Sequence, residues 1–125
     1  MKKLFLILST VLMTGLSAQA DVPWKEVAFA TVAAEQPTYR NIGITNNRQD
    51  FSEVRVLVQS TGVRIQRAEV VTDERMSLPV WHLEGDYSLN AEVTDTFEKS
   101  KIIAVRMYIT TLQPGEPVQI RIFMR

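Results

Sequence analysis

The stretch VRMYITTLQPGEPVQIRIFMR, residues 105–125, decides the fold class. Apolar side chains alternate with polar or aromatic ones over residues 105–110 and again over residues 118–125. A period of two is typical of a β-strand that buries one face. Between the two runs, Pro114 and Gly115 occupy the central positions of a four-residue turn signature. The stretch therefore predicts two antiparallel strands joined as a hairpin.

The outward face of the predicted hairpin is the main candidate binding surface. If residue 113 pairs with residue 116, the inward pairs are Val105–Met124, Met107–Ile122 and Ile109–Ile120. The side chains left outside are Arg106, Tyr108, Arg121, Phe123 and Arg125. An exposed guanidinium over an aromatic ring contributes about 0.5–1 kcal/mol, and its planar donors suit carboxylates and sulfates. We predict a docking face for an anionic or glycan-like ligand or a protein partner; the alternative is a solvated face whose arginines only prevent aggregation.

The same alternation recurs through the rest of the chain, and no stretch after residue 20 shows convincing helical periodicity. The further strands are expected over residues 24–32, 39–44, 51–59, 63–70, 76–80 and 87–93. Seven to nine short strands, with turns about every ten residues, are typical of antiparallel strands folded into two layers. We therefore predict an all-β fold, an antiparallel β-sandwich or jelly roll.

Three local irregularities are expected within this fold. The inward parity switches between Ile65 and Ala68, so an extra residue, a β-bulge, is expected near residues 66–67. Pro79 restricts its strand to a sheet edge or a bulge. The capping-box spacing that begins at Asp95 predicts one helical turn over residues 96–100.

The first twenty residues have the pattern of a signal peptide. Lys2 and Lys3 precede an apolar run over residues 4–13, and Ala18-Gln19-Ala20 is a small-x-small cleavage site. The apolar run is shorter than the ~20 residues that a membrane-spanning helix needs, so a permanent anchor is the weaker interpretation. We expect cleavage after Ala20, a single mature domain over residues 21–125, no membrane insertion after cleavage, and a periplasmic or secreted location.

Composition excludes several classes of function. The 125 residues are enough for one domain, and the chain contains no cysteine, which excludes thiol catalysis, a lipoprotein anchor and any cysteine-based metal or haem site. Beyond residue 20 there are twelve basic and fourteen acidic residues, a net charge of −2. Such a balance lacks the basic excess that nucleic-acid binding needs, so no nucleic-acid partner is expected.

The C-terminal three-fifths of the chain resembles an uncharacterised family of small exported bacterial proteins. The matching pieces are a Phe-led strand over residues 51–58, the parity break from Val63 to Val70, the strand entry at residues 102–105, and the final strand over residues 118–125. In place of the glycine turn that such relatives often carry, this chain has residues 72–75, Thr-Asp-Glu-Arg. The resemblance implies a β-sandwich and brings no activity or functional residues with it.

Few side chains point to catalysis or metal binding. His82 is the single histidine, and strand geometry is expected to send the nearby serines and carboxylates to different faces, so a polar residue at a strand end is expected. The acidic pairs Asp73-Glu74 and Glu84/Asp86 do not have the spacing of a calcium loop. No cofactor and no metal are therefore expected.

The two tryptophans allow a second interpretation. Trp24 is expected to pin the first strand to the sheet, whereas Trp81 either caps the rim of the core or points outward as a stacking platform for a sugar ring or an anchor for a partner. The leading hypothesis is an exported, non-enzymatic binding or accessory protein with an unknown protein or glycan partner. The alternatives are a carbohydrate-binding module that uses Trp81, and a small hydrolase or lyase.

Overall fold

The computed structural model describes residues 22–45, 48–113 and 115–125, so the predicted signal peptide lies outside the described residues. The strands, in chain order, are β1 (Lys25–Val32), β2 (Thr38–Gly43), β3 (Asp50–Val58), β4 (Val63–Thr72), β5 (Ser77–Pro79), β6 (Gly85–Tyr87), β7 (Glu92–Thr111) and β8 (Val118–Met124). One short 3-10 turn, η1 (Trp81–Leu83), is the single helical element of the described part. The predicted all-β fold is confirmed.

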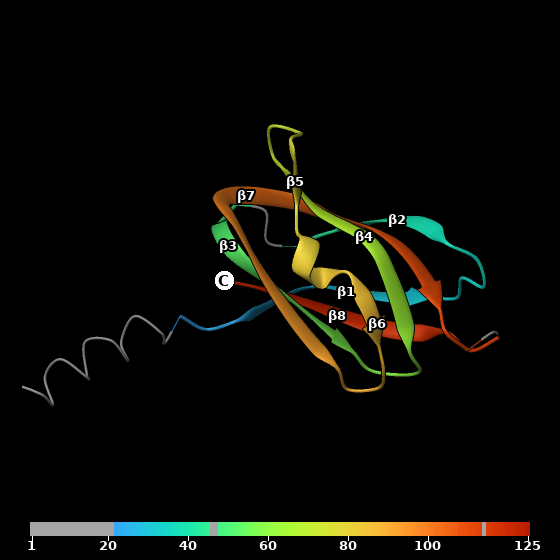
Figure 1. Ribbon diagram of the computed structural model, residues 1–125. Coiled ribbons are helices and arrows are strands. Elements are labelled where there is room, and N and C mark those ends of the chain that lie inside the picture. Colours follow the sequence, from blue (N-terminus) through green and yellow to red (C-terminus); the bar gives the residue numbers. More distant parts are fainter. Residues whose placement is uncertain (1–21, 46–47, 114) are drawn as a thin grey trace, which may run out of the picture.

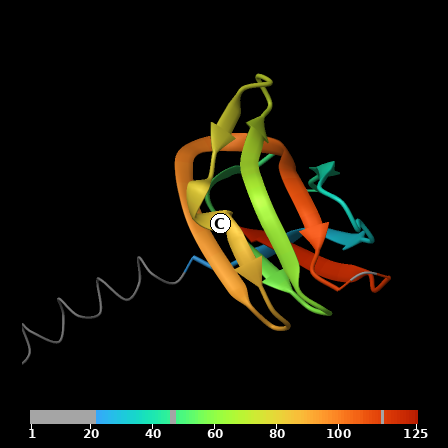
Figure 2. The ribbon, with the colours of Figure 1, turned by 45° about the vertical axis from the view of Figure 1, so that its right-hand side comes forward.

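The strands form two layers that share the long strand β7 (Figures 1 and 2). The first sheet has the order β1-β8-β3 and ends in the N-terminal half of β7. The second sheet runs from β2 through the C-terminal half of β7 to β4, whose far edge pairs with β5 and β6. Every pairing is antiparallel, so the molecule is a β-sandwich in which β7 bends over from one layer into the other.

The bend of β7 coincides with two breaks in strand register. On its β3 side the pairing shifts between Phe51 and Glu53, and on its β4 side between Val71 and Thr72. Extra residues at such positions increase local twist and turn a strand. A 20-residue strand can therefore serve both layers without a loop.

The core lies between the two layers and is built from the alternating residues. Val54, Val56 and Val58 of the first sheet and Val105 and Met107 of the second are all fully buried. Because burial of a large apolar side chain contributes about 1.5–3 kcal/mol, this interior supplies most of the stability of a chain without disulfides.

The predicted C-terminal hairpin is wrong. β8 pairs with β1 and β3, and β7 pairs with β2, β3 and β4, so none of the three expected pairs forms. Ile122 lies opposite Ala28 and Val56, for example, instead of Met107. The alternating apolar residues of both strands are nevertheless buried, because alternation selects the face of a strand and not its neighbour.

Of the other local predictions, two are confirmed and two are wrong. The register of β4 shifts between Ile65 and Arg67, which confirms the predicted bulge. The edge position of β5 is confirmed because, among the described residues, β5 pairs with β4 alone. The strand expected over residues 87–93 is wrong, since β6 ends at Tyr87, a turn follows, and β7 begins at Glu92. The helical turn over residues 96–100 is also wrong, because these residues belong to β7.

Candidate binding face

The residues predicted to share one face lie on opposite sides of the sandwich. Arg106 and Tyr108 belong to the half of β7 in the second sheet, whereas Arg121, Phe123 and Arg125 belong to β8 or follow it in the first sheet. The single face proposed from the sequence is therefore wrong as a geometric arrangement. The reason is the connection after β7, which crosses from one layer to the other instead of turning back within a layer.

The outer face of the first sheet is closed by contacts among its own residues. The guanidinium groups of Arg55 and Arg125 both lie over the Trp24 ring, each 4.3 Å from the ring centroid. Arg125 also pairs with Glu53 and donates to the carbonyl of Val22 at 3.1 Å. Trp24 thus ties the segment before β1 to the sheet, as expected.

Arg121 on the same face is engaged as well. Its guanidinium pairs with Glu26 of β1 and lies 5.7 Å from the centroid of the Phe123 ring. Arg55, Arg121 and Arg125 therefore each hold a ring, a carboxylate or both. Carboxylates thus engage Arg121 and Arg125, whereas Arg55 contacts only the Trp24 ring and its buried Nε has no hydrogen-bond partner among the described residues.

The outer face of the second sheet carries a row of three side chains across three adjacent strands. The register places Arg67 of β4 beside Tyr108 of β7, and Tyr108 beside Tyr39 of β2. The two tyrosine rings meet edge to face, with centroids 5.5 Å apart and planes at 73°. Arg67 is exposed, and in the described part of the chain its side chain has no hydrogen bond or ion pair.

The neighbouring row holds the tyrosines in place. Glu69 accepts a hydrogen bond from Arg106 Nη1 at 3.1 Å and one from the Tyr39 hydroxyl at 3.3 Å, both at its Oε1. Further along the sheet, Arg64 donates through two nitrogens to Asp86, at 2.8 and 3.1 Å, and these hydrogen bonds hold the pKa of Asp86 below its ordinary value. Three arginines against two carboxylates leave this face with one excess positive charge, carried by Arg67.

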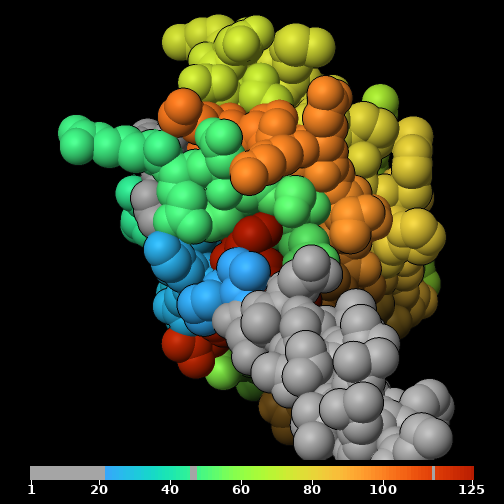
Figure 3. Space-filling view, turned by 90° about the vertical axis from the view of Figure 1, so that its left-hand side faces the viewer, coloured from blue at the N-terminus to red at the C-terminus, as the bar shows by residue number. Residues whose placement is uncertain are grey.

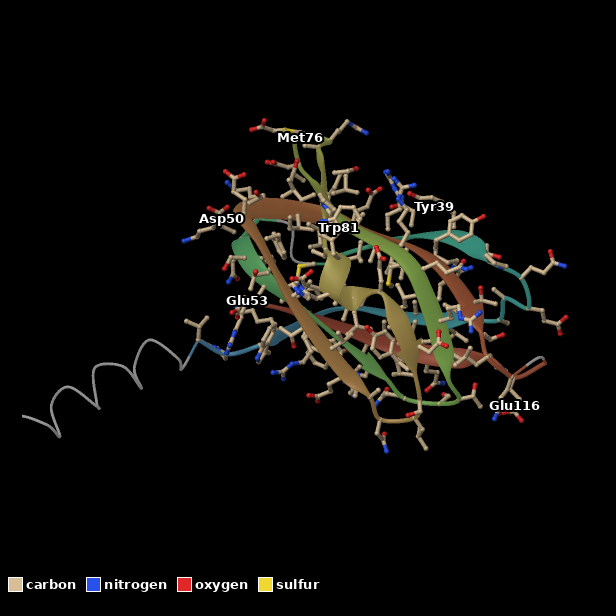
Figure 4. All side chains as sticks on the ribbon, viewed as in Figure 1. Tyr39, Asp50, Glu53, Met76, Trp81 and Glu116 are labelled. Atoms are coloured by element: carbon tan, nitrogen blue, oxygen red, sulfur yellow. The ribbon has the colours of Figure 1, made fainter. Side chains whose placement is uncertain are left out.

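Trp81 lies on neither sheet face but on η1, beside the edge of β4 (Figure 4 labels Trp81 and Tyr39). Its neighbours Val80 and Leu83 are fully buried, while the Trp81 side chain is 66% exposed. The rim-capping alternative is therefore wrong for Trp81 itself, and Val80 and Leu83 fill that part of the core instead.

His82 has a carboxylate partner that the sequence did not reveal. Asp95 of β7 is buried, and its Oδ2 accepts a hydrogen bond from the His82 amide at 3.0 Å. Its Oδ1 accepts one from the Thr96 amide at 2.7 Å and lies 2.9 Å from Nδ1 of the His82 imidazole. Burial would raise the pKa of Asp95, but these hydrogen bonds outweigh burial and lower it. The one signal available was an acidic residue at an inward position of an alternating strand, between Val93 and Phe97.

The contact between His82 and Asp95 resembles the contact between the histidine and the carboxylate of a hydrolytic Ser-His-Asp triad. The His82 side chain is 82% exposed, so its remaining nitrogen faces solvent. Among the residues that the structure describes, no serine or threonine hydroxyl hydrogen-bonds to the imidazole. The imidazole has a carboxylate partner, but in the described part of the chain the hydroxyl nucleophile that a triad requires does not contact it.

The acidic loop residues singled out in the sequence do not converge. Asp73 and Glu74 line an open cleft of about 400 Å³ beside the bend of β7, together with Lys99 and Lys101 (Figure 3 shows this end, with β7 in orange below the β4–β5 hairpin). Within the described residues no group of three or more His, Asp or Glu is placed to hold a metal ion. In the same part of the chain, no helix is long and apolar enough to cross a bilayer.

Comparison with known proteins identifies the fold and no family. No protein-family model matches the chain, and no curated protein matches it. Among solved structures, AlgX of Pseudomonas aeruginosa superposes with a TM-score of 0.50 at 9% identity over 81% of this chain. The chain spans only 26% of AlgX, so the likeness concerns one part of that protein and shows the fold alone.

Two further solved structures match less well. FeII HppE superposes with a TM-score of 0.37 at 6% identity, over 78% of this chain and 40% of HppE. The SPBc2 prophage-derived protein YomS superposes with a TM-score of 0.40 at 11% identity, over 83% of this chain and 98% of YomS.

Proposed function

We propose that the protein is an exported, non-enzymatic binding module that recognises an acidic polysaccharide on the outer face of its second sheet. The observation that carries the proposal is the row of Arg67, Tyr108 and Tyr39, in which an arginine without a partner among the described residues lies beside two packed aromatic rings. The export part of the proposal rests on the leader pattern of residues 1–20.

The chemistry of this row suits a sugar that carries a carboxylate or sulfate. A guanidinium binds such groups through parallel donors, and aromatic rings pack against the apolar faces of sugar rings. Neighbouring strands lie about 4.8 Å apart, so a row across three strands spans about 10 Å and can contact more than one sugar unit.

The two tyrosines of the row are also preorganised. Glu69 fixes Arg106 and Tyr39, and Tyr39 in turn packs against Tyr108, so binding does not have to order these side chains. Each side chain that is already ordered saves about 0.5–1.5 kcal/mol of the cost of binding.

The test is binding of the purified protein to heparin and to polygalacturonate, with neutral dextran as the comparison, by isothermal titration calorimetry. We expect binding to both acidic polymers that weakens with salt, and a loss of about tenfold in Arg67→Ala, because a charge-assisted hydrogen bond contributes about 1.5–3 kcal/mol. Arg121→Gln removes the same charge from the opposite face and serves as the matched control. Equal binding by wild type and Arg67→Ala, or no binding to either acidic polymer, would contradict the proposal.

A second candidate uses η1 in place of the sheet face. A tryptophan that is 66% exposed, on a turn held by buried neighbours, is a rigid platform for a neutral sugar ring. In Trp24→Phe, fluorescence reports Trp81 alone. Quenching by soluble neutral glucans, together with retained binding in Arg67→Ala, would favour this candidate over the sheet face.

A further inference from the structure

The two ends of the row formed by Arg67, Tyr108 and Tyr39 differ in charge. At the β4 end, the Arg67 guanidinium is exposed and has neither a hydrogen bond nor an ion pair within the described residues. At the β2 end, the Tyr39 hydroxyl already donates to Glu69 Oε1 at 3.3 Å. The row therefore carries its uncompensated positive charge at one end.

Glu69 sets the charge at the tyrosine end. The same Oε1 accepts from Arg106 Nη1 at 3.1 Å, so this carboxylate balances the guanidinium of the neighbouring row. Glu69 and Arg106 lie opposite each other, two residues along their strands from Arg67 and Tyr108, which separates the rows by about 7 Å. The Glu69 side chain is only 15% exposed, and a pair withdrawn from water is screened less by salt than an exposed pair.

Two further arginines on these strands do not add a free charge beside the tyrosines. Arg40 follows Tyr39 on β2, so its side chain points to the opposite face, where it donates to a main-chain carbonyl of β1 at 3.2 Å. Arg64 lies on the other side of Arg67 along β4 and is held by Asp86 through two hydrogen bonds.

A ligand carboxylate is consequently favoured at one end of the row and disfavoured at the other. At Arg67 it meets a planar set of unused donors, which compensates for the water that it loses. Over Tyr108 and Tyr39 it meets ring faces, which carry partial negative charge, and a guanidinium already balanced by Glu69. An uncharged sugar unit packs its apolar face on the same rings without this cost.

We propose that the face selects an acidic polysaccharide in which charged units alternate with uncharged ones, and that Glu69 is the residue that sets this preference. The charged unit binds at Arg67, and the neighbouring uncharged unit packs on Tyr108 and Tyr39. The inference rests on the proposed function and specifies the class of acidic polysaccharide that this face recognises. A polymer with a charge on every unit still binds through Arg67, but it brings its next charge to a place without a free cation.

The experiment compares two hexasaccharides with the same backbone. One is hexagalacturonate, with a carboxylate on every unit, and the other is the same hexasaccharide with every second carboxylate methyl-esterified. Both are titrated into the isotopically labelled protein and followed by NMR chemical shifts, at about 0.15 M salt, where exposed charges more than about 8 Å apart are largely screened. We expect the half-esterified compound to bind about threefold or more tightly to wild type, because its second unit brings no uncompensated charge.

The wild-type titrations distinguish this inference from the proposed function. Equal affinities, or tighter binding of the fully charged hexasaccharide, would overturn the preference for alternation and leave the acidic-polysaccharide face standing. No binding of either compound would overturn both. Arg67→Ala is expected to weaken both compounds alike, because each places a charged unit there, and a changed ratio of the two affinities would contradict the placement.

Glu69→Gln tests the residue that sets the preference. The amide keeps the shape and an acceptor oxygen for Tyr39 but leaves the Arg106 charge unbalanced, so the tyrosine end gains a cation. We expect hexagalacturonate to bind about threefold more tightly than it does to wild type, and the preference for the half-esterified compound to disappear. An unchanged preference would overturn the role of Glu69.

Glu26→Gln is the matched control. It removes the same charge from the opposite face, where Glu26 pairs with Arg121. We expect this variant to keep the wild-type ratio of the two affinities. If the ratio changed as much as in Glu69→Gln, the net charge of the protein would set the preference and the proposal would be overturned.

Discussion

The two outer faces of the sandwich contain the same kinds of residue and differ in what those residues contact. On the first sheet, the guanidinium groups of Arg55 and Arg125 both contact the Trp24 ring, and Arg125 also pairs with Glu53. On the second sheet, Arg67 projects beside Tyr108 and Tyr39 without a partner among the described residues. Arginine and aromatic content therefore does not distinguish a binding face from a structural one. The difference lies in whether every guanidinium already contacts a ring or a carboxylate, which holds for Arg55, Arg121 and Arg125 and not for Arg67.

The largest expected effect is the loss of folding stability when an aromatic ring is removed from the first face, compared with the same change on the second face. Trp24→Ala removes a half-buried ring and its contacts with two guanidinium groups, so we expect the free energy of unfolding to fall by about 2–3 kcal/mol. Tyr39→Ala removes a half-exposed ring from the other face and is expected to cost less than about 1 kcal/mol. Urea denaturation of both variants measures the two losses. If the two losses were equal, the first face would not be the structural one.

An intermediate effect is expected from the loss of a carboxylate, and it compares buried Asp95 with exposed Asp86 on the second face. The pKa of Asp95 is lowered in the folded protein, whereas a carboxyl in an unfolded chain titrates near 3.9. The folded state therefore binds its proton less readily, and the stability due to Asp95 is present above about pH 4 and is lost as the pH falls through the folded pKa.

Asp95→Asn tests this dependence. We expect it to lower the free energy of unfolding by about 1–3 kcal/mol at pH 7, because the His82 and Thr96 amides lose a charged acceptor, and by progressively less below about pH 4. The matched variant Asp86→Asn breaks an exposed pair with Arg64 and is expected to change stability far less. Urea midpoints between pH 3 and pH 7 measure both, and a pH-independent loss in Asp95→Asn would contradict the assignment.

The smallest effects are expected from substitutions of arginine by lysine, which keep the positive charge on each face. Arg67→Lys keeps a cation but loses the planar donors, so we expect threefold to tenfold weaker polysaccharide binding, or about 0.7–1.4 kcal/mol, with unchanged stability. Arg55→Lys loses its stack on Trp24 and is expected to lower the free energy of unfolding by about 0.5–1 kcal/mol with binding unchanged. Calorimetric titration and urea denaturation of both variants complete the test. The opposite assignment of effects would exchange the roles of the two faces.

The alternation of apolar and polar residues predicted which side chains of the candidate sites point outward, but it did not predict which residues they contact. Alternation identified Arg106 and Tyr108 as outward side chains, but it did not predict their neighbours Glu69 and Tyr39, which come from strands distant in the sequence. The contact of His82 with Asp95 joins a 3-10 turn to an inward position of β7. The capping-box spacing at Asp95 led to a wrong prediction, because this carboxylate accepts from the His82 amide of η1 and the Thr96 amide of β7 and not from the first turn of a helix.

The amino-acid sequence by itself determined the all-β class, the inward face of most strands and the bulge in β4, because each depends on which neighbouring residues in one strand avoid water. The tertiary structure alone decided which strands are neighbours. The inward side chains of β7 and β8 satisfy the same core whether they pair with each other or lie in opposite layers. Only the bend of β7, the crossing to β8 and the packing of both layers together select one arrangement, and that arrangement assigns the arginines to two separate faces.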